Sequence, residues 1–311
     1  MVVMENVKKT FEYLFKEMEK VVVGQDQLLN ELMVAILTDS NALIESYPGL
    51  AKTLTVRTMA QLMDLKFSRI QNTPDLMPSD ITGTYIIEET DGKRAFKFQP
   101  GPIFANIVLA DEINRATPKT QSALLEAMQE KQVTVGNKTY ELDRPFFVLA
   151  TQNPIEQEGT YPLPEAQSDR FLLKIIVGYP KFDDEVEIVT RYAEDERPPV
   201  LRPVIKKDSI LQLQKLTRQV PVNNDLKKYV VELVTKTRTK KDLIEYGASP
   251  RASIGLILAA KARALIDGRK FVSKDDINAM AMPVLRHRII LNFEAERKGM
   301  TTDDCIKSLL K

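Results

Sequence analysis

Short apolar runs alternate with helix-like patterns over the first part of the chain. The apolar runs are typical of buried strands and stand at 42–44, 67–70, 107–110, 146–150 and 171–177. Helical periodicity separates them at 52–63 and 118–129. Strands that alternate with helices are typical of βαβ units, whose strands form a mostly parallel sheet. The pattern therefore predicts an α/β domain.

Two segments interrupt this alternation, and we expect each to form a β-hairpin that projects from the domain. In residues 81–98, two strand-like pieces flank the Asp-Gly turn signal at 91–92. In residues 132–142, two more flank Gly-Asn at 136–137. Both dipeptides favour the tight turns that connect antiparallel strands.

A proline-rich segment at 197–203 divides the chain. Its three prolines fix φ and lack a backbone N–H, so a helix cannot continue through them. We therefore predict an α/β domain over 1–196, a linker over 197–203 and a second domain over 204–311. The second part has helical periodicity throughout, which predicts an all-α domain. Its basic cluster at 286–288 is expected to be solvated or to lie between the domains.

Composition and charge narrow the function classes. The chain has 44 Lys and Arg against 43 Asp and Glu, so it lacks the basic excess of proteins that bind nucleic acid by bulk electrostatics. It contains no apolar run of roughly 20 residues and no signal-peptide core, so we expect a cytoplasmic protein without a membrane span. The single Cys305 and the single His287 exclude zinc sites and Ser-His triads. Any metal must therefore use oxygen ligands.

A candidate phosphate-binding loop follows the first predicted strand. The segment 46–53 ends with Lys52-Thr53 at the start of the next helix. In phosphate-binding loops, such a lysine neutralises the β- and γ-phosphates, and the following hydroxyl binds Mg²⁺. The two glycine positions of the G-x-x-x-x-G-K-[ST] pattern are Ser46 and Ala51 here. By itself the segment is as consistent with an ordinary strand-to-helix turn as with a phosphate site.

Two adjacent carboxylates end a later strand. Asp111 and Glu112 follow the apolar run 107–110, where one carboxylate can bind Mg²⁺ and the other can activate the attacking water. Alternatively, they are acids at a strand end that face solvent. Their place one strand-helix-strand unit after Lys52 favours the functional interpretation. Asn153, after the next predicted strand, is placed to align that water, although an Asn-Pro there is often only a turn.

These motifs and the segments around them resemble those of MoxR-type AAA+ ATPases. The resemblance covers most of the first domain, through the segments 22–25, 48–53, 73–83, 98–106, 111–116, 119–128, 150–154 and 169–171. It implies a P-loop NTPase fold, in which an αβα domain with a mostly parallel five-stranded sheet precedes a smaller all-α lid. The two expected hairpins then correspond to inserts of this clade, where force would be delivered.

The resemblance also implies how ATP is held. Val23 and Gly24 match the segment that lies against adenine. The phosphate loop comprises Pro48, Gly49, Leu50, Ala51, Lys52, Thr53 and Leu54. Thr53 and Asp111 would bind Mg²⁺, Asp111 through water. Ser46 departs from the family, which has glycine there, and its Cβ would weaken nucleotide binding if the backbone needed a positive φ.

Four residues receive catalytic roles from the resemblance. Glu112 would activate the water, and Asn153 would align it with the γ-phosphate. Arg251, in a Ser-Pro-Arg motif that opens a lid helix, matches the residue that contacts the γ-phosphate of its own subunit. Arg170 matches the arginine finger that family members supply to the neighbouring subunit. Without the resemblance, Arg170 would be interpreted as an ion-pair partner of Asp169 or a nearby acid.

The resemblance finally implies a function. We expect a Mg²⁺-dependent ATP hydrolase that works as a homo-oligomer, in this family a ring of six, and that remodels or activates a client protein. Family clients are often proteins with von Willebrand factor A (VWA) domains, and the outcome is frequently metal or cofactor insertion. A nucleotide-gated scaffold with little turnover is the alternative that Ser46 keeps open. A nucleic-acid remodeller is a further alternative, which the near-zero net charge argues against.

Overall fold

A five-stranded parallel sheet forms the centre of the molecule. The computed structural model describes residues 2–90, 93–155, 159–193 and 199–310. The strand order is β2-β5-β8-β1-β9, and every pairing in this sheet is parallel. The strands are β1 (Ala42–Ser46), β2 (Phe67–Gln71), β5 (Ile107–Asp111), β8 (Phe147–Gln152) and β9 (Leu173–Val177). The predicted α/β fold is therefore confirmed.

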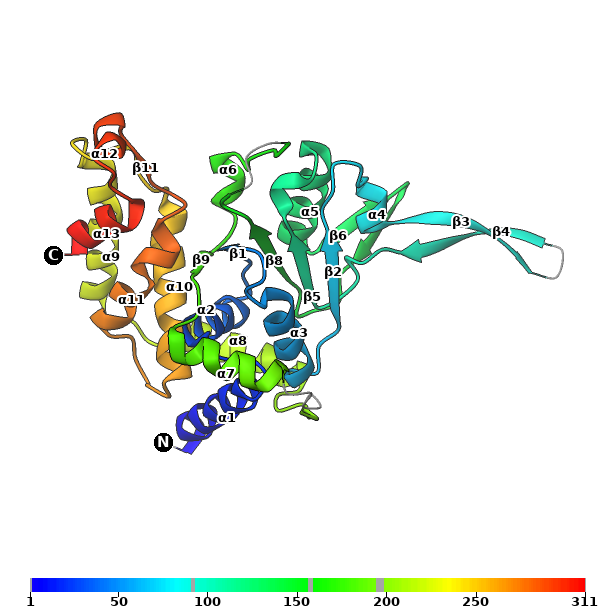
Figure 1. Cartoon of the computed structure of the whole chain (residues 1–311), viewed down its shortest axis with the longest axis horizontal. Helices are drawn as coiled ribbons and strands as arrows, with labels where there is room; N and C mark the ends of the chain where they lie inside the picture. Colours follow the sequence, from blue (N-terminus) through cyan, green and yellow to red (C-terminus); the bar gives the residue numbers. More distant parts are fainter. Residues whose placement is uncertain (1, 91–92, 156–158, 194–198, 311) are drawn as a thin grey trace.

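Helices cover both faces of this sheet (Figure 1). The helices of this part of the chain are α1 (Val2–Glu19), α2 (Asp26–Leu37), α3 (Lys52–Leu62), α4 (Pro78–Thr82), the 3₁₀ helix η1 (Ile113–Arg115), α5 (Pro118–Glu130), α6 (Glu165–Ser168), α7 (Phe182–Ala193) and α8 (Lys207–Gln219). Alternate residues of β5 enter different cores: Ile107 and Leu109 join residues of α2 and α3, whereas Val108 and Ala110 join residues of α5. A strand buried on both faces is apolar at successive positions, which explains the continuous apolar runs.

The remaining helices form the lid. They are α9 (Asn224–Thr239), α10 (Pro250–Ile266), α11 (Lys274–Leu285), α12 (Phe293–Arg297) and α13 (Thr302–Leu310), with a two-stranded ribbon of β10 (Ile244–Tyr246) and β11 (Ile290–Leu291). α10 packs against α1, α2 and α8, and α11 packs against β9. The helical lid thus lies along the β9 edge of the sheet (Figure 1). Within the described ranges, no helix combines the length and apolar character of a membrane span.

The linker predicted at 197–203 leads into α8, which contacts both parts of the molecule. The first two linker residues lie outside the described ranges. Gln214 Nε2 of α8 donates to Ile36 O of α2 over 2.8 Å, and α8 also packs on α10. The domain limits 1–196 and 204–311 stay a prediction.

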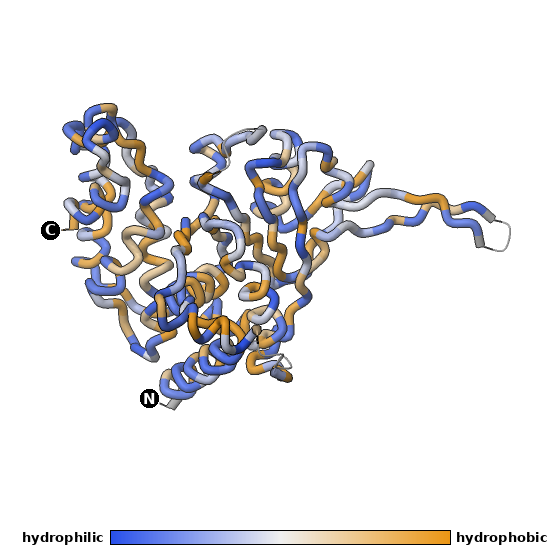
Figure 2. The backbone as a smooth tube through the Cα atoms, viewed as in Figure 1, coloured by the Kyte–Doolittle hydropathy of each residue, from blue (hydrophilic) through white to orange (hydrophobic). Residues whose placement is uncertain are grey.

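Two antiparallel hairpins occupy the segments that interrupt the alternation. β3 (Gly83–Thr90) pairs with β4 (Lys93–Pro100), and β6 (Gln132–Val135) pairs with β7 (Lys138–Glu141). The turn expected at 91–92 lies outside the described residues. The β3–β4 hairpin projects far from the body (Figure 1), and apolar residues occur along it (Figure 2). At its base, Phe98 stacks on Tyr140 with ring centroids 4.2 Å apart, and a hydrogen bond to Tyr85 raises the pKa of Tyr140 to about 12.

Candidate functional site

The carboxyl ends of three strands bring the expected site residues to one edge of the sheet. Ser46 ends β1, Asp111 ends β5 and Gln152 ends β8, which lies between the other two. Ligands of open α/β sheets bind at this edge. The expected phosphate loop and Asn153 continue directly from two of these strands.

Lys52 begins α3 and folds back over the loop. Its Nζ donates to Tyr47 O (3.0 Å), Ser46 Oγ (3.1 Å) and Ser46 O (3.4 Å). In the described part of the chain, no side chain caps α3, so the N–H groups of its first turn are available to an anion. Burial lowers the pKa of Lys52, while the charges of Asp111 and Glu112 act in the opposite direction. The lysine and both carboxylates therefore share one electrostatic site.

In the phosphate loop, Gly49 and Ala51 adopt a left-handed backbone conformation, whereas Ser46 does not. φ is 81° at Gly49 and 53° at Ala51, whereas Ser46 is not among the described residues with positive φ. The buried Ser46 hydroxyl donates to Tyr47 O (2.9 Å) and accepts from Lys52. The Cβ of Ser46 was expected to weaken nucleotide binding only if the backbone there needed a positive φ. Ser46 does not have a positive φ, so this reason for weaker binding does not apply.

A cavity of about 320 Å³ lies beside the loop. The cavity is lined by residues that were expected to bind the nucleotide, namely Val23, Gly24, Pro48, Gly49, Leu50, Ala51 and Leu54. Gln25 ties the two segments together, because its Nε2 donates to Leu50 O (2.8 Å) and its Oε1 accepts from Thr55 Oγ1 (3.1 Å). Tyr179 and Ile188, which were not predicted, also line the cavity. The volume lies within the range of small-molecule sites, and the cavity adjoins the expected phosphate loop.

Gly24 occupies a turn that excludes a side chain. Its φ is 69°, and a Cβ built there would lie 2.5 Å from Asp184 Oδ2 in the first turn of α7. Tyr192 in the last turn of α7 donates to Val21 O (2.6 Å). The segment expected to contact adenine is thus packed between the loop and α7.

Both carboxylate oxygens of Asp111 have partners. Thr151 Oγ1 donates to Oδ1 (2.6 Å), and Arg69 donates to Oδ2 through Nη2 (2.5 Å) and Nε (3.1 Å). A guanidinium therefore stands against the carboxylate that the sequence assigns to Mg²⁺. Thr53 lies in the first turn of α3, and its hydroxyl adds a second oxygen donor.

Mg²⁺ prefers such oxygen ligands and usually keeps water and phosphate in its shell. Within the described ranges, no group of three or more His, Cys, Asp or Glu could hold a metal ion. Thr53 and Asp111 each carry an oxygen donor of the type that Mg²⁺ prefers, so both residues are chemically compatible with the ion. The Arg69 guanidinium shows that Asp111 attracts positive charge at this position.

Glu112 is held by polar neighbours of adjacent strands. Gln71 Nε2 donates to Glu112 Oε2 (3.2 Å), and Arg115 Nε lies 3.2 Å from the same oxygen. The backbone N of Glu112 donates to Thr151 Oγ1 (2.8 Å). Sequence reasoning missed Arg69, Gln71 and Thr151, because they reach the carboxylates only through the pairing of β2 and β8 with β5. The sequence offered one signal for these partners, namely that polar residues occur within the strand pattern of β2.

Asn153 follows β8 and is buried, with 9% of its surface exposed. Its Oδ1 accepts from Ile155 N (3.2 Å), and the residue lines a second cavity, of about 370 Å³, together with Glu45 and Asn114. Because β8 lies between β5 and β1, Asn153 emerges between the carboxylates and the phosphate loop.

Arg170 and Arg251 lie together, and neither lines the cavity beside the phosphate loop. Both line a different cavity, of about 290 Å³. Arg251 Nη1 lies 3.4 Å from Asp169 Oδ2, whereas the described residues offer the exposed Arg170 guanidinium no ion pair, with Asp169 or any other acid. Arg251 therefore lies beside Asp169 and Arg170, and its expected contact with the γ-phosphate of its own subunit stays a prediction.

The basic cluster at 286–288 is interdomain and not solvated. The side chains of Arg286 and Arg288 are only 5% and 3% exposed. Arg286 donates to Lys174 O of β9 (3.1 Å), and Arg288 donates to the Asp169 carboxylate (2.7 Å). Both residues therefore join the lid to the α/β domain.

Comparisons with known proteins agree with this arrangement. A family model described as the ATPase family associated with various cellular activities (AAA) matches residues 41–173, and an AAA lid domain model matches 236–309. Chaperone MoxR1 of Mycobacterium tuberculosis is 44% identical over 310 residues, which cover 97% of this chain and 81% of that protein. YeaC of Bacillus subtilis is 44% identical over 295 residues, which cover 95% and 91%. A solved structure from Cytophaga hutchinsonii has a TM-score of 0.91 and 46% identity, and the match covers 99% of this chain and 95% of that one.

Proposed function

Because the chain belongs to the MoxR-type AAA+ ATPases, we propose that it hydrolyses ATP with Mg²⁺ and thereby remodels or activates a client protein. One observation carries this proposal. Lys52, Asp111 and Glu112 share one electrostatic site at the carboxyl edge of the sheet, next to a cavity lined by the expected nucleotide residues.

The proposed chemistry assigns a task to each polar group. Lys52 leaves its loop contacts and binds the β- and γ-phosphates, and the N–H groups in the first turn of α3 bind phosphate oxygens. Glu112 accepts a proton from the attacking water, which Asn153 aligns with the γ-phosphate. Thr53 and Asp111 would hold Mg²⁺, which would supply charge neutralisation on the phosphates when bound.

Arg170 is exposed and forms no ion pair with the described residues, which supports a site that is completed between subunits. We propose that Arg170 reaches the nucleotide of the next subunit in a ring, which in this family has six members. Arg251 lies beside Arg170 and away from the cavity of its own loop, so we assign it to the same neighbouring nucleotide. An isolated protomer then lacks a complete site.

The projecting hairpin is the proposed client contact. Ile87 and Phe96 lie directly opposite each other across β3 and β4, and they are 63% and 77% exposed. An exposed apolar pair in the outer half of a long hairpin suits transient contact with a partly apolar client. A client with a VWA domain, and metal or cofactor insertion as the outcome, remain proposals based on the family resemblance.

The test is steady-state ATP hydrolysis over a series of protein concentrations, with the mass measured by light scattering. Specific activity should rise as rings form. Lys52→Ala should abolish nucleotide binding, and Glu112→Gln should bind ATP without turnover. Normal turnover in either variant would refute the assignment.

A nucleotide-gated scaffold is the alternative to a hydrolase. Its support came from Ser46, and that support weakens because Ser46 does not adopt a positive φ. ATP binding without single-turnover hydrolysis at any oligomeric state would establish the scaffold instead.

A further inference from the structure

We propose that Arg288 of the lid is a positioning residue for the arginine finger, so that the lid of one subunit controls hydrolysis in the next. The inference rests on the proposed function, in which Arg170 reaches the neighbouring nucleotide. It adds that the lid contacts the backbone on both sides of Arg170 and thereby positions the arginine finger.

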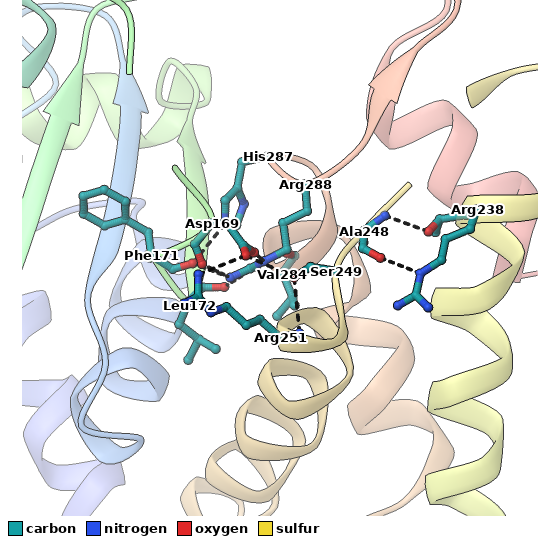
Figure 3. A network of polar contacts seen from close by, with 11 residues as sticks. Asp169, Phe171, Leu172, Arg238, Ala248, Ser249, Arg251, Val284, His287 and Arg288 are labelled. Atoms are coloured by element: carbon teal, nitrogen blue, oxygen red, sulfur yellow. Dashed lines mark hydrogen bonds and ion pairs between the residues drawn. The ribbon is translucent and has the colours of Figure 1, made fainter. Parts of the chain in front are cut away.

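The Arg288 guanidinium holds the segment that bears Arg170 (Figure 3). Its Nε donates to Asp169 Oδ1 (2.7 Å), and its Nη2 donates to Asp169 O (3.2 Å) and Phe171 O (2.5 Å). Its Nη1 donates to Leu172 O (3.0 Å) and also to Val284 O within the lid. The guanidinium therefore binds the residue before Arg170 and the two residues after it.

Three further lid groups contact the same segment. Arg251 Nη1 lies 3.4 Å from Asp169 Oδ2. Ser249 Oγ, at the start of α10, donates to Asp169 Oδ2 (3.0 Å). His287 Nε2 lies 3.0 Å from Phe171 O. Because Phe171 O can only accept, this ring nitrogen is the protonated one. Both oxygens of Asp169 and the carbonyl of Phe171 are thus held by the lid.

The α/β domain anchors the chain directly after Arg170, where the fully buried Phe171 packs in the core with residues of β1, β8 and α5, but it gives less support to the residues before Arg170. α6, which leads into it, is four residues long and has no buried residue. Arg170 N donates to Gln167 O at 3.2 Å and Phe171 N donates to Ser168 O at 3.1 Å, and both bonds stay within the segment. The bond from Leu172 N to Asn41 O (2.9 Å) leads to the sheet. The residues before Arg170 are therefore held mainly by the lid, whereas Phe171 stays anchored in the core, and we expect the residues before Arg170 to follow the lid when it moves.

Arginine is required at position 288 for a geometric reason. Only a planar guanidinium presents several N–H donors in fixed directions to acceptors on successive residues. A lysine keeps the charge but offers one ammonium on a flexible stem. Arg288→Lys therefore tests the directed contacts while it retains the positive charge near Asp169.

Arg286 provides a matched control. It lies two residues away, is similarly buried, and also joins the lid to the α/β domain, through Lys174 O (3.1 Å) and the lid residue Asp303 (2.9 Å). Its contacts fall on β9 and not beside the finger. Arg286→Lys should therefore disturb the interface between lid and domain without displacing Arg170.

The experiment compares rings of one variant with mixed rings. Arg288→Lys should bind a fluorescent ATP analogue normally but lose most of its turnover, as Arg170→Ala does. Mixed with Glu112→Gln, which has an intact finger and a dead site, Arg288→Lys should regain activity. At equal amounts and random mixing, about a quarter of all sites pair a working site with a working finger. Arg286→Lys should keep its turnover unmixed.

The mixed rings separate the two proposals. If Arg170→Ala regains activity with Glu112→Gln but Arg288→Lys does not, Arg288 acts within its own subunit, and the inference is overturned while the function stands. If neither mixture regains activity, the finger does not act between subunits, and both fail.

Amide hydrogen exchange tests the inference without any activity. In Arg288→Lys, exchange at the amides of Arg170 and Phe171 should accelerate by about tenfold or more, because the carbonyls around them lose their lid partner. The rest of the chain should retain its protection, which also shows that the variant folds. Unchanged exchange at these two amides, or equal acceleration in Arg286→Lys, would overturn the inference.

Discussion

The contact between Arg69 and Asp111 predicts a competition with Mg²⁺. The guanidinium occupies Asp111 Oδ2 at 2.5 Å, while the proposed function places Mg²⁺ on the same carboxylate. Binding of the ion must therefore weaken or displace this ion pair. Replacing Arg69 by methionine removes the charge and retains most of the apolar stem, so the Mg²⁺ requirement should fall.

The exposure of the two side chains sets the size of the effect. Arg69 is 45% exposed and Asp111 only 11% exposed, so the pair is intermediate between a surface and a buried ion pair. Surface pairs contribute about 0.2–1 kcal/mol, and a pair at an effective dielectric constant of about 20 has a Coulomb energy of about 4 kcal/mol before desolvation. We take about 1 kcal/mol as the cost of displacement. This corresponds to about a fivefold lower Mg²⁺ concentration at half-saturation.

The assay is a Mg²⁺ titration of fluorescent ATP binding in the Glu112→Gln background, where nucleotide is not consumed. Arg94→Met is the control, because Arg94 pairs with Glu89 on the exposed hairpin. It should leave the titration unchanged. An unchanged or higher Mg²⁺ requirement in Arg69→Met would refute the competition and would mean that Arg69 orients Asp111 for the ion.

Three further predictions concern the loop, the adenine segment and a buried acid. Ser46→Gly should change the dissociation constant for ATP by less than about threefold in a fluorescence titration, since the position needs no positive φ; a gain above tenfold would show that the Cβ obstructs the nucleotide. Gly24→Ala should destabilise the fold by about 1–3 kcal/mol in urea unfolding and weaken ATP binding, because its Cβ meets Asp184. Gly49→Ala, with nothing within 4 Å of the added Cβ, should cost less. Burial raises the pKa of Glu31, whose Oε2 has no partner among the described residues. The stability that the neutral form of Glu31 contributes is therefore present at low pH and is lost as the pH rises through the raised pKa. Glu31→Gln removes this loss, so it should increase the Tm more at about pH 8 than at about pH 5. Equal shifts at both pH values would show that Glu31 is ionised in the fold.

The sheet and the phosphate loop were predictable because local pattern and tertiary structure agree there. β5 is apolar at each position from 107 to 110, since alternate residues enter the cores on opposite faces of the sheet. Lys52 is identified by its place between a strand and a helix, and this short-range geometry is encoded within a few residues. The helices α1 and α2 were not predicted, although α1 is amphipathic.

The partners of the catalytic carboxylates were not predictable in the same way. Arg69 and Asp111 are 42 residues apart, and they meet because β2 pairs with β5 in a register that sets Gln71 opposite Asp111. A register between strands depends on the packing of the whole sheet, and no spacing along the chain records it. The same holds for Thr151, which reaches Asp111 from β8.

The spatial position of Arg251 could not be predicted from its sequence motif alone. The Ser-Pro-Arg motif predicted a helix start, and Ser249 does cap α10 by accepting from Arg251 N (3.2 Å). The motif does not determine which subunit's nucleotide Arg251 contacts. That depends on the packing of α10 and α11 along α2 and the β9 edge, which places Arg251 beside Asp169 and Arg170. A local motif thus identifies the side chain, while the docking of the lid decides which subunit it can reach. The trans assignment of Arg251 therefore depends on the same interface between lid and domain that Arg288 holds together.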